Sequence, residues 1–521
     1  MATRREKSDG RTVPKGRRKA APTAERGRGG KATTASEQAG QRDLFLETAD
    51  SPQGAATNTG TDLSVPGWRA VPKSRHMPGL NLPAMTMEEV TSDENLRRAF
   101  AEVARNRGAP GPNGQSINEV REHFDEILPV LSRSLVDGSY RPGMIRRVWI
   151  PKPGGGERGL GIPDVVDRWV QQAVHQVLSP HWEPTFHPSS HGFRPGRSCH
   201  TAIAEAKKYL EEGYEWVVDL DLEKFFDRVH WQRLVARLEH KVKDRRLIDL
   251  IWQMLKAKVV MPDGVVTSTE EGVPQGGPLS PLLSNIVLDE LDQELARRGH
   301  RFVRYADDEN IYVRSERAGH RVMASVVQFI EKRLRLKVNQ AKSAVAQPKE
   351  RHFVGFRLRK EARSGRIEVL LSERSRDRLG TKIRELTPRS WGQSLSGCIS
   401  KINVYLLGWI NFFGPVCTRA TASVLATTDA HIRRRLRAIL LRQWKRKRFI
   451  ARRLTSMGAG TSAWHSVYKG HKSLWALSHC RPVDEVLSKH YFGLRGLVSL
   501  EQCFRDMHKV TVSAQLELPL K

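Results

Sequence analysis

The stretch Phe302–Val313, FVRYADDENIYV, places two adjacent aspartates between two apolar runs. Aromatic and β-branched residues on both sides of Asp307 and Asp308 predict two strands joined by a tight turn at the two aspartates. Two carboxylates at a hairpin tip repel each other. Mg²⁺ removes that repulsion and needs only one or two carboxylates plus phosphate oxygens. The stretch therefore suits metal-dependent phosphoryl transfer, although an Asp-Asp pair taken alone is more often a solvated turn.

A second acidic stretch upstream favours the metal site. Residues 215–227, EWVVDLDLEKFFD, form an apolar run interrupted by acids. Alternate residues of a strand share a face, which predicts two groups: Val218, Leu220 and Leu222 on one face, and Val217, Asp219 and Asp221 on the other. Acids on a buried strand are costly unless something pairs with them. Two such elements indicate one shared carboxylate cluster, which two-metal displacement at phosphorus requires.

The two acidic stretches resemble known sequence blocks. Tyr305–Asp308 resembles the acidic box of reverse transcriptases, and Asp219–Asp227 resembles the catalytic strand that precedes it. Other blocks similar to those of group II intron reverse transcriptase–maturases follow in order over most of the chain. The resemblance implies an α+β right-hand polymerase, in which fingers and a palm with an antiparallel catalytic sheet precede a helical thumb or maturase domain and a small helical C-terminal DNA-binding domain.

Composition and resemblance together divide the chain. Residues 1–85 are basic and lack apolar periodicity, which predicts a disordered tail. The resemblance implies fingers and palm over 86–370, a thumb or maturase domain over 371–455 and a DNA-binding domain over 456–521. Aromatics among basic residues in the last part suit base stacking and suit a small helical core equally: Trp464, Tyr468, Trp475, Tyr491, Phe492 and Phe504. Many relatives continue into an endonuclease with paired cysteines, and its absence before Lys521 predicts no second-strand nicking.

The resemblance assigns catalytic roles to four residues. Asp221, Asp307 and Asp308 are implied to hold two Mg²⁺ ions, with Asp219 on the same strand face but outside the family's ligand pattern. Lys342 lies in a later block and is implied to protonate the leaving pyrophosphate as a general acid. The alternative for Lys342 is an ordinary surface lysine.

Two basic residues are assigned to the triphosphate of an incoming nucleotide. Lys152 and Arg158 flank a glycine turn within residues 150–163, IPKPGGGERGLGIP, which predicts a fingers hairpin. Both side chains are able to reach a triphosphate beneath the turn, and cationic clamps on phosphate serve phosphoryl transfer. Either residue in isolation is more often a surface charge.

Two further residues are assigned to the sugar and base of that nucleotide. Gln275 lies in residues 272–277, GVPQGG, whose glycines let the backbone approach a base pair closely. Phe226 lies five residues beyond Asp221, where similar enzymes place an aromatic that leaves no room for a 2′-hydroxyl. The resemblance therefore implies DNA synthesis, and Phe225 is the better candidate for ordinary core packing.

Other stretches are assigned to RNA and DNA. Residues 189–200, SSHGFRPGRSCH, resemble a loop-to-helix block that contacts template, so Arg194 is expected to stack on or pair with the template backbone. Residues 431–448, HIRRRLRAILLRQWKRKR, predict a helix with an apolar stripe at Ile432, Leu436, Ile439 and Leu440. Its other face carries cations that we expect to contact phosphates, with a solvated face as the plainer alternative: Arg433, Arg434, Arg437, Lys445 and Arg446.

Composition favours a nucleic-acid partner. The 521 residues include 87 Lys and Arg against 57 Asp and Glu, a net charge of +30. Such a charge favours a polyanion, although a ribosomal or chromatin-like protein would share it. The five cysteines form no Cys-x-x-Cys pair, which argues against a structural zinc site and a disulfide framework. Without a membrane-length apolar run or a signal-peptide core, the chain is expected in the bacterial cytoplasm or nucleoid, with no membrane partner.

The resemblance implies an RNA-directed DNA polymerase that is also an intron maturase. Its partners would be its group II intron RNA, a target DNA and dNTPs, and it would assist splicing and copy the intron by target-primed reverse transcription. One rival is a splicing factor with an inactive polymerase fold, against which the intact Asp221, Asp307, Asp308 and Gln275 argue. The other is a free-standing reverse transcriptase of antiviral defence or CRISPR acquisition, against which the maturase-like C-terminal stretches argue.

Overall fold

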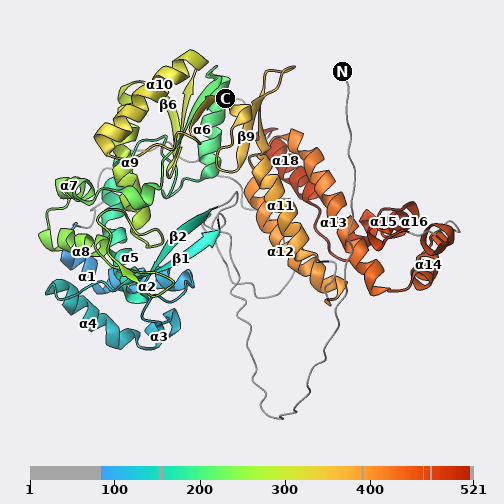
Figure 1. Cartoon of the computed structure of the whole chain (residues 1–521), viewed down its shortest axis with the longest axis horizontal. Coiled ribbons are helices and arrows are strands. Elements are labelled where there is room, and N and C mark those ends of the chain that lie inside the picture. Colours follow the sequence, from blue (N-terminus) through green and yellow to red (C-terminus); the bar gives the residue numbers. More distant parts are fainter. Residues whose placement is uncertain (1–83, 152–155, 389–391, 461–462, 470–471, 517–521) are drawn as a thin grey trace, which may run out of the picture. The chain divides into compact units, whose positions relative to one another are not determined.

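The computed structural model describes residues 84–516 except 152–155, 389–391, 461–462 and 470–471 (Figure 1). Nearly all of the predicted tail, and Lys152 of the predicted nucleotide site, lie outside the described residues. None of the described helices is long and apolar enough to cross a membrane.

Helices and strands alternate in the first part of the described chain, and helices follow. The strands are β1 Ile145–Pro151, β2 Glu157–Pro163, β3 Trp216–Asp221, β4 Val259–Val260, β5 Val266–Thr267, β6 Arg301–Tyr305, β7 Asp308–Val313, β8 Ala344–Ala346, β9 Phe356–Lys360 and β10 Ile367–Leu371. The helices up to β10 are α1 Met87–Thr91, α2 Asp93–Arg105, α3 Ile117–Glu122, α4 Phe124–Val136, α5 Val165–Trp182, α6 Cys199–Glu211, α7 Trp231–Lys241, α8 Arg245–Leu255, α9 Ser280–Arg297 and α10 Glu316–Phe329. The later helices are α11 Glu373–Leu386, α12 Leu395–Phe413, α13 Ala422–Gln443, α14 Lys447–Ser456, α15 Leu474–Leu477, α16 Arg481–Val486, α17 Lys489–Gly493 and α18 Leu500–Leu516.

The central sheet has the strand order β6-β7-β3-β8, and every neighbouring pair is antiparallel. This confirms the predicted antiparallel catalytic sheet and the α+β class. The two acidic stretches are adjacent strands, since β3 pairs with β7 along its full length. The upstream strand is shorter than its sequence indicates: β3 ends at Asp221, and residues 225–228 form a short 3-10 helix.

The hairpin between β6 and β7 differs from the prediction by one residue. Tyr305 pairs with Asp308, so the two turn residues are Ala306 and Asp307 rather than the two aspartates. A two-residue hairpin needs a left-handed backbone conformation in its turn, and Ala306 adopts it with φ of 58°. Asp308 is consequently the first residue of β7, and strand pairing fixes its position.

The central sheet lies between two apolar cores. On one face it packs against the fingers and palm helices through Val218, Leu220, Phe302 and Ile311. On the other face Val217, Val303 and Tyr312 join a second core that includes α6, β9, β10 and the helices that follow. The predicted alternation of β3 is therefore confirmed, and apolar residues cover both faces over much of the sheet.

A second sheet forms the fingers, with the order β2-β1-β4-β5. β1 and β2 make the predicted antiparallel hairpin, from the Ile145–Pro163 pair to the Pro151–Glu157 pair. The loop that contains Gln275 is attached to this hairpin, because the Gly161 amide donates a hydrogen bond of 2.7 Å to the Gln275 carbonyl.

The chain after β10 is helical. Helices α11, α12, α13 and α18 lie side by side (Figure 1), and α18 contacts both α12 and α13. The predicted apolar stripe of α13 is confirmed, because Ile432, Leu436, Ile439 and Leu440 are all buried. Of the C-terminal aromatics, Phe492 and Phe504 are fully buried core residues.

Candidate active site

The three predicted catalytic carboxylates come together at one end of the central sheet. Asp221 at the end of β3 lies directly opposite Asp308 at the start of β7, and Asp307 is in the adjoining turn. Asp308 remains accessible to solvent, yet protein surrounds it and raises its pKa to about 7, with the carboxylates of Asp307, Asp219 and Asp221 adding to the effect. The pKa of Asp307 is raised too, first by burial.

Cations lie around these carboxylates. Lys342 Nζ is 3.4 Å from Asp221 Oδ2, with its side chain about two-thirds exposed. The positive charge of Arg158 opposes the raised pKa of both Asp307 and Asp308, which places this fingers residue in their vicinity. The structure therefore brings together three predicted carboxylates and two of the predicted cations.

Asp219 is separated from the cluster by a partner that the sequence did not reveal. Arg351 Nη2 lies 2.6 Å from Asp219 Oδ2 and also donates to the carbonyl of Lys342. Burial raises the pKa of Asp219, and the Arg351 guanidinium opposes that shift. Because Arg351 binds the Asp219 carboxylate more closely than Lys342 approaches Asp221, the Asp221 carboxylate is the better candidate metal ligand on this strand face.

The donor set fits Mg²⁺. Carboxylate oxygens are the ligands that this ion prefers, and carboxyl groups with raised pKa values are a cluster that a cation would stabilise. In the part of the chain that the structure describes, no group of three or more His, Cys, Asp or Glu residues is already arranged to hold a metal ion. Mg²⁺ commonly takes only one or two carboxylates and completes its shell with water and substrate phosphates.

A buried arginine supports the catalytic turn from behind. Arg304 on β6 is fully buried and forms an ion pair of 2.6 Å with the equally buried Asp292 of α9. The same guanidinium donates to Asn285 Oδ1, to Ser190 Oγ and, at 2.8 Å, to the carbonyl of Ala306 in the turn. One side chain thus connects the turn to α9 and to the 189–192 loop. The sequence signal for it was a charged residue within an apolar strand, which needs a buried partner.

The 189–192 loop supports the same hairpin through its backbone. The His191 amide donates to the Arg304 carbonyl at 2.8 Å, and the Arg304 amide donates to the Ser189 carbonyl at 2.9 Å. A Cβ atom on Gly192 would lie 2.1 Å from the Ala306 nitrogen, so only glycine fits against the turn. The His191 ring is held by hydrogen bonds to Glu205 and Thr201, which gives it a structural role in this loop.

Arg194 does not fit its predicted contact with template. Its side chain is buried and donates to Glu183 Oε1 and to the carbonyls of His187 and Ser190. These contacts use the guanidinium to close the loop that supports the hairpin. The prediction is corrected to a structural role because a buried, fully engaged arginine cannot reach a phosphate.

The remaining nucleotide residues surround the same end of the sheet. The Val273 amide donates to the Phe226 carbonyl at 2.6 Å, which ties the Gln275 loop to the segment after β3. Phe225 is buried and Phe226 is partly exposed, with their rings edge-to-face at 5.2 Å. The distinction predicted between a core Phe225 and an accessible Phe226 matches this burial.

The basic helix is only partly available to phosphates. Arg433 and Arg434 are partly exposed on α13, and Lys445 and Arg446 are exposed just beyond it. Arg437 is buried instead, where it donates to the Leu487 carbonyl at 2.8 Å and pairs with Asp484. The predicted phosphate contact of Arg437 is therefore corrected to a bond between α13 and the C-terminal helices.

Comparisons with known proteins agree with this geometry. Residues 150–358 match the family model "Reverse transcriptase (RNA-dependent DNA polymerase)", and residues 376–458 match "Group II intron, maturase-specific domain". Protein YkfC of Escherichia coli K12 is 33% identical over 350 residues, which cover 59% of this chain and 91% of YkfC. The group II intron-encoded protein LtrA of Lactococcus lactis subsp. cremoris is 38% identical over 197 residues, 37% of this chain and 32% of LtrA.

Among solved structures, a partial Cas6-RT-Cas1–Cas2 complex is 23% identical, covers 50% of this chain and 46% of that one, and has a TM-score of 0.32. The two family models together span the palm sheet and α11–α13, and YkfC is matched over nearly its whole length. The chain therefore belongs to the family of group II intron-encoded reverse transcriptases and maturases, and its enzymatic class is RNA-directed DNA polymerase.

Proposed function

We propose that the chain binds its cognate group II intron RNA, assists its splicing and copies it into DNA by target-primed reverse transcription. The observation that carries the polymerase part is the pairing of Asp221 with Asp308 across β3 and β7, with Asp307 in the turn between β6 and β7. These three carboxylates are the proposed ligands of two Mg²⁺ ions, and the reverse transcriptase family generally uses Mg²⁺. Bound there, Mg²⁺ would supply positive charge to the attacking primer 3′-oxygen and to the leaving pyrophosphate.

The neighbouring cations are proposed to act on the triphosphate. Arg158 on the fingers hairpin would bind its phosphate oxygens, and Lys152 beside the glycine turn has the same proposed role. Lys342 Nζ, 3.4 Å from Asp221 Oδ2, would hold the proton that passes to the pyrophosphate oxygen when the bond to the α-phosphate breaks. Gln275 would contact the base pair that the new nucleotide forms.

The helical part of the chain supplies the proposed RNA surface. Arg433, Arg434, Lys445 and Arg446 are at least partly exposed, and Arg434 stacks over the Trp475 ring at 4.2 Å. An arginine placed over an aromatic ring combines a cation with the guanidinium geometry that pairs with phosphates, which suits RNA contacts. The high net positive charge of the whole chain supports the same partner.

Replacing Phe226 with alanine tests the polymerase and its sugar selection together. The native protein should extend a DNA primer on an RNA template with Mg²⁺ and dNTPs, and should not use rNTPs. Phe226→Ala should lose about a hundredfold in selectivity against rNTPs, because the ring no longer excludes the 2′-hydroxyl. Single-nucleotide incorporation kinetics with each substrate measure the ratio.

Phe225→Leu is the matched control, since Phe225 is buried and should affect stability rather than selectivity. Equal selectivity against rNTPs in the native protein and in Phe226→Ala would show that Phe226 does not exclude the 2′-hydroxyl. If the native protein makes no DNA yet speeds splicing of its intron RNA, the proposed polymerase activity is excluded and the proposed splicing function remains.

Gly276 provides a separate test of the link between the nucleotide loop and the fingers. A Cβ atom on Gly276 would lie 2.4 Å from the Gly161 carbonyl oxygen, and its φ is +132°. We therefore expect Gly276→Ala to displace the loop that contains Gln275 from β2 and to break the hydrogen bond from the Gly161 amide to the Gln275 carbonyl. Primer extension should fall at least about tenfold.

Gly264→Ala separates backbone strain from steric clash. Gly264 has a φ of +85°, but a Cβ atom there meets nothing within 4 Å. This control should lose about 1 kcal/mol of folding free energy and keep its activity. If both variants keep full activity in steady-state dNTP titrations, the loop position does not matter for catalysis.

A further inference from the structure

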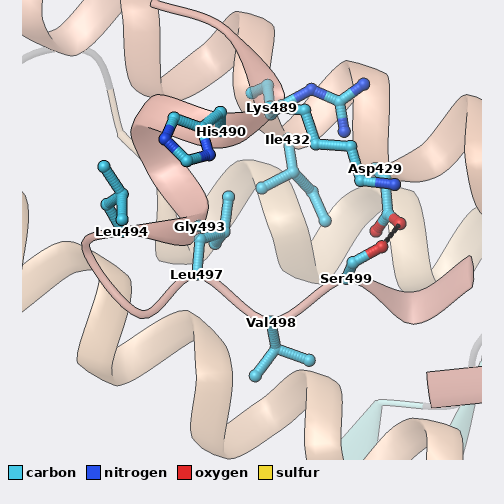
Figure 2. Close-up of a pocket in the computed structure, with 10 residues that line it drawn as sticks. Asp429, Ile432, Lys489, His490, Gly493, Leu494, Leu497, Val498 and Ser499 are labelled. Carbon is cyan, nitrogen blue, oxygen red and sulfur yellow. Dashed lines mark hydrogen bonds between the residues drawn. The ribbon is translucent and has the colours of Figure 1, made fainter. Parts of the chain in front are cut away.

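A cavity of about 520 Å³ opens between α13, α17 and the segment that leads from α17 into α18 (Figure 2). Its walls are mostly apolar, and the lining residues include Ile432 from α13 and Leu494, Leu497 and Val498 from the segment. Leu494 is 72% exposed, and Leu497 and Val498 are partly exposed. Apolar side chains gathered around a solvent-filled hollow are costly to leave in water, and cavities of this size commonly bind ligands.

The rim of this cavity carries two cations, Arg433 of α13 and Lys489 of α17, and His490 of α17 also lines it. Across the described residues, the structure shows no hydrogen bond or ion pair to any of these three side chains. Cations over an apolar hollow suit a ligand with an anionic part and a flat, poorly solvated part.

The acidic residue that lines the cavity is already engaged. Asp429 of α13 accepts hydrogen bonds from Ser499 Oγ at 2.7 Å, from the Leu500 amide at 3.0 Å and from the Glu501 amide at 3.1 Å. Figure 2 shows the Asp429 and Ser499 side chains pointing toward each other. The carboxylate thus caps the start of α18 and fixes the wall of the cavity, and its charge is partly offset by these donors.

We propose that this cavity takes one unstacked base of single-stranded RNA, with the flanking phosphates on Arg433 and Lys489. A base offers an apolar ring to the walls, and sequence-reading proteins commonly take RNA bases that are splayed out of single strands. We choose RNA over DNA because Asp429, Ile432 and Arg433 lie within residues 376–458, which match the maturase-specific domain. The other lining residues lie between Lys489 and Ser499, in the predicted DNA-binding domain, so the test includes a DNA probe. The proposal rests on the RNA binding proposed above and assigns it a specific subsite.

Gly493 allows the cavity to be filled without strain. It lines the cavity at the end of α17, and a Cβ atom there meets nothing within 4 Å. Gly493→Leu is therefore expected to add an apolar side chain at the cavity lining without a clash, and so to hinder entry of a base. Gly408→Leu on α12 is the matched control, because its Cβ atom also meets nothing within 4 Å and it lies outside the cavity lining.

The measurement compares two probes of about 12 nucleotides on the full-length protein: oligouridine, and the same ribose-phosphate chain without bases. In the native protein and in Gly408→Leu, removing the bases should weaken binding about tenfold more than in Gly493→Leu. Leu494→Ser, a change at an exposed position, should reduce this base dependence in the same direction, and it keeps the test available if Gly493→Leu does not fold.

The outcomes separate the two proposals. Native protein that binds neither probe overturns the RNA binding of the proposed function, and the cavity with it. Native protein that binds oligouridine with the same base dependence as Gly493→Leu and Leu494→Ser overturns the cavity and leaves RNA binding in place. The same comparison is made with oligodeoxythymidine. If Gly493→Leu weakens binding of oligodeoxythymidine as much as or more than binding of oligouridine, the assignment to RNA is overturned.

Discussion

Replacing Asp308 with asparagine is expected to lower RNA-templated primer extension at least about a thousandfold, because it removes a carboxylate from the place where charge develops in the transition state. Asp308 begins β7 directly opposite Asp221, so strand pairing should hold the substituted side chain in the same position. Steady-state extension with Mg²⁺ measures the loss. Binding of intron RNA by the same variant should be unchanged, since the basic surface on α13 is untouched.

Asp219→Asn is the control for the Asp308 variant. Asp219 lies on the same sheet face but is bound by Arg351, so we expect this variant to keep at least about a tenth of the activity. A larger loss of activity in Asp219→Asn than in Asp308→Asn would show that the cation binds beside Asp219 rather than beside Asp308.

The Asp308 variant should also change how folding stability depends on pH in the absence of divalent cations. The pKa of Asp308 is raised from 3.8 to about 7 in the folded protein, so the folded state binds its proton more tightly than the unfolded state does. Stability should therefore fall as pH rises from about 4 to about 7 in EDTA. Asp308→Asn should show a smaller fall, measured as thermal unfolding at pH 5 and pH 8.

Arg304→Met is expected to cost about 3–5 kcal/mol of folding free energy, because it leaves the Asp292 carboxylate buried without its partner. Both side chains are almost completely inaccessible, so water cannot replace the lost ion pair. Urea unfolding measures the change. The exposed Arg297, which pairs with Glu294, provides the control, and Arg297→Met should cost less than about 1 kcal/mol.

A double variant separates the role of Arg304 in folding from its role in catalysis. Arg304→Met with Asp292→Leu removes both charges, and such apolar replacements often recover the stability that a single change loses. Primer extension by the double variant should remain at least about tenfold below that of the native protein, because the Ala306 carbonyl in the turn still lacks the hydrogen bond from Arg304. Recovery of full activity together with stability would show that Arg304 does not position the turn.

The sequence predicted the features that depend on local pattern. Alternation along 215–227 placed Asp221 on the face it occupies, and the acidic hairpin lies where the flanking strands indicated. The turn itself was misplaced by one residue, because Ala306 adopts a left-handed conformation that its residue type does not suggest.

Features that depend on packing between distant segments were not predictable. Arg351 reaches Asp219 from 132 positions away, and no spacing rule connects them. Arg194 and Arg437 were assigned to phosphates because a single segment shows which residues are charged and does not show which face packs against a neighbour. Each is buried by segments whose approach only the folded chain reveals: the 183–190 region for Arg194, and α16 with Leu487 for Arg437.

The second core has a consequence for how the chain can be divided. Val217, Val303 and Tyr312 of the catalytic sheet share that core with Leu406 of α12 and Leu436 of α13. One family match ends at residue 358 and the other begins at residue 376, yet the apolar core is continuous across this boundary. Polymerase and maturase regions are therefore poor candidates for exchange as independent modules between relatives, and a change in one region would select for compensating changes in the other.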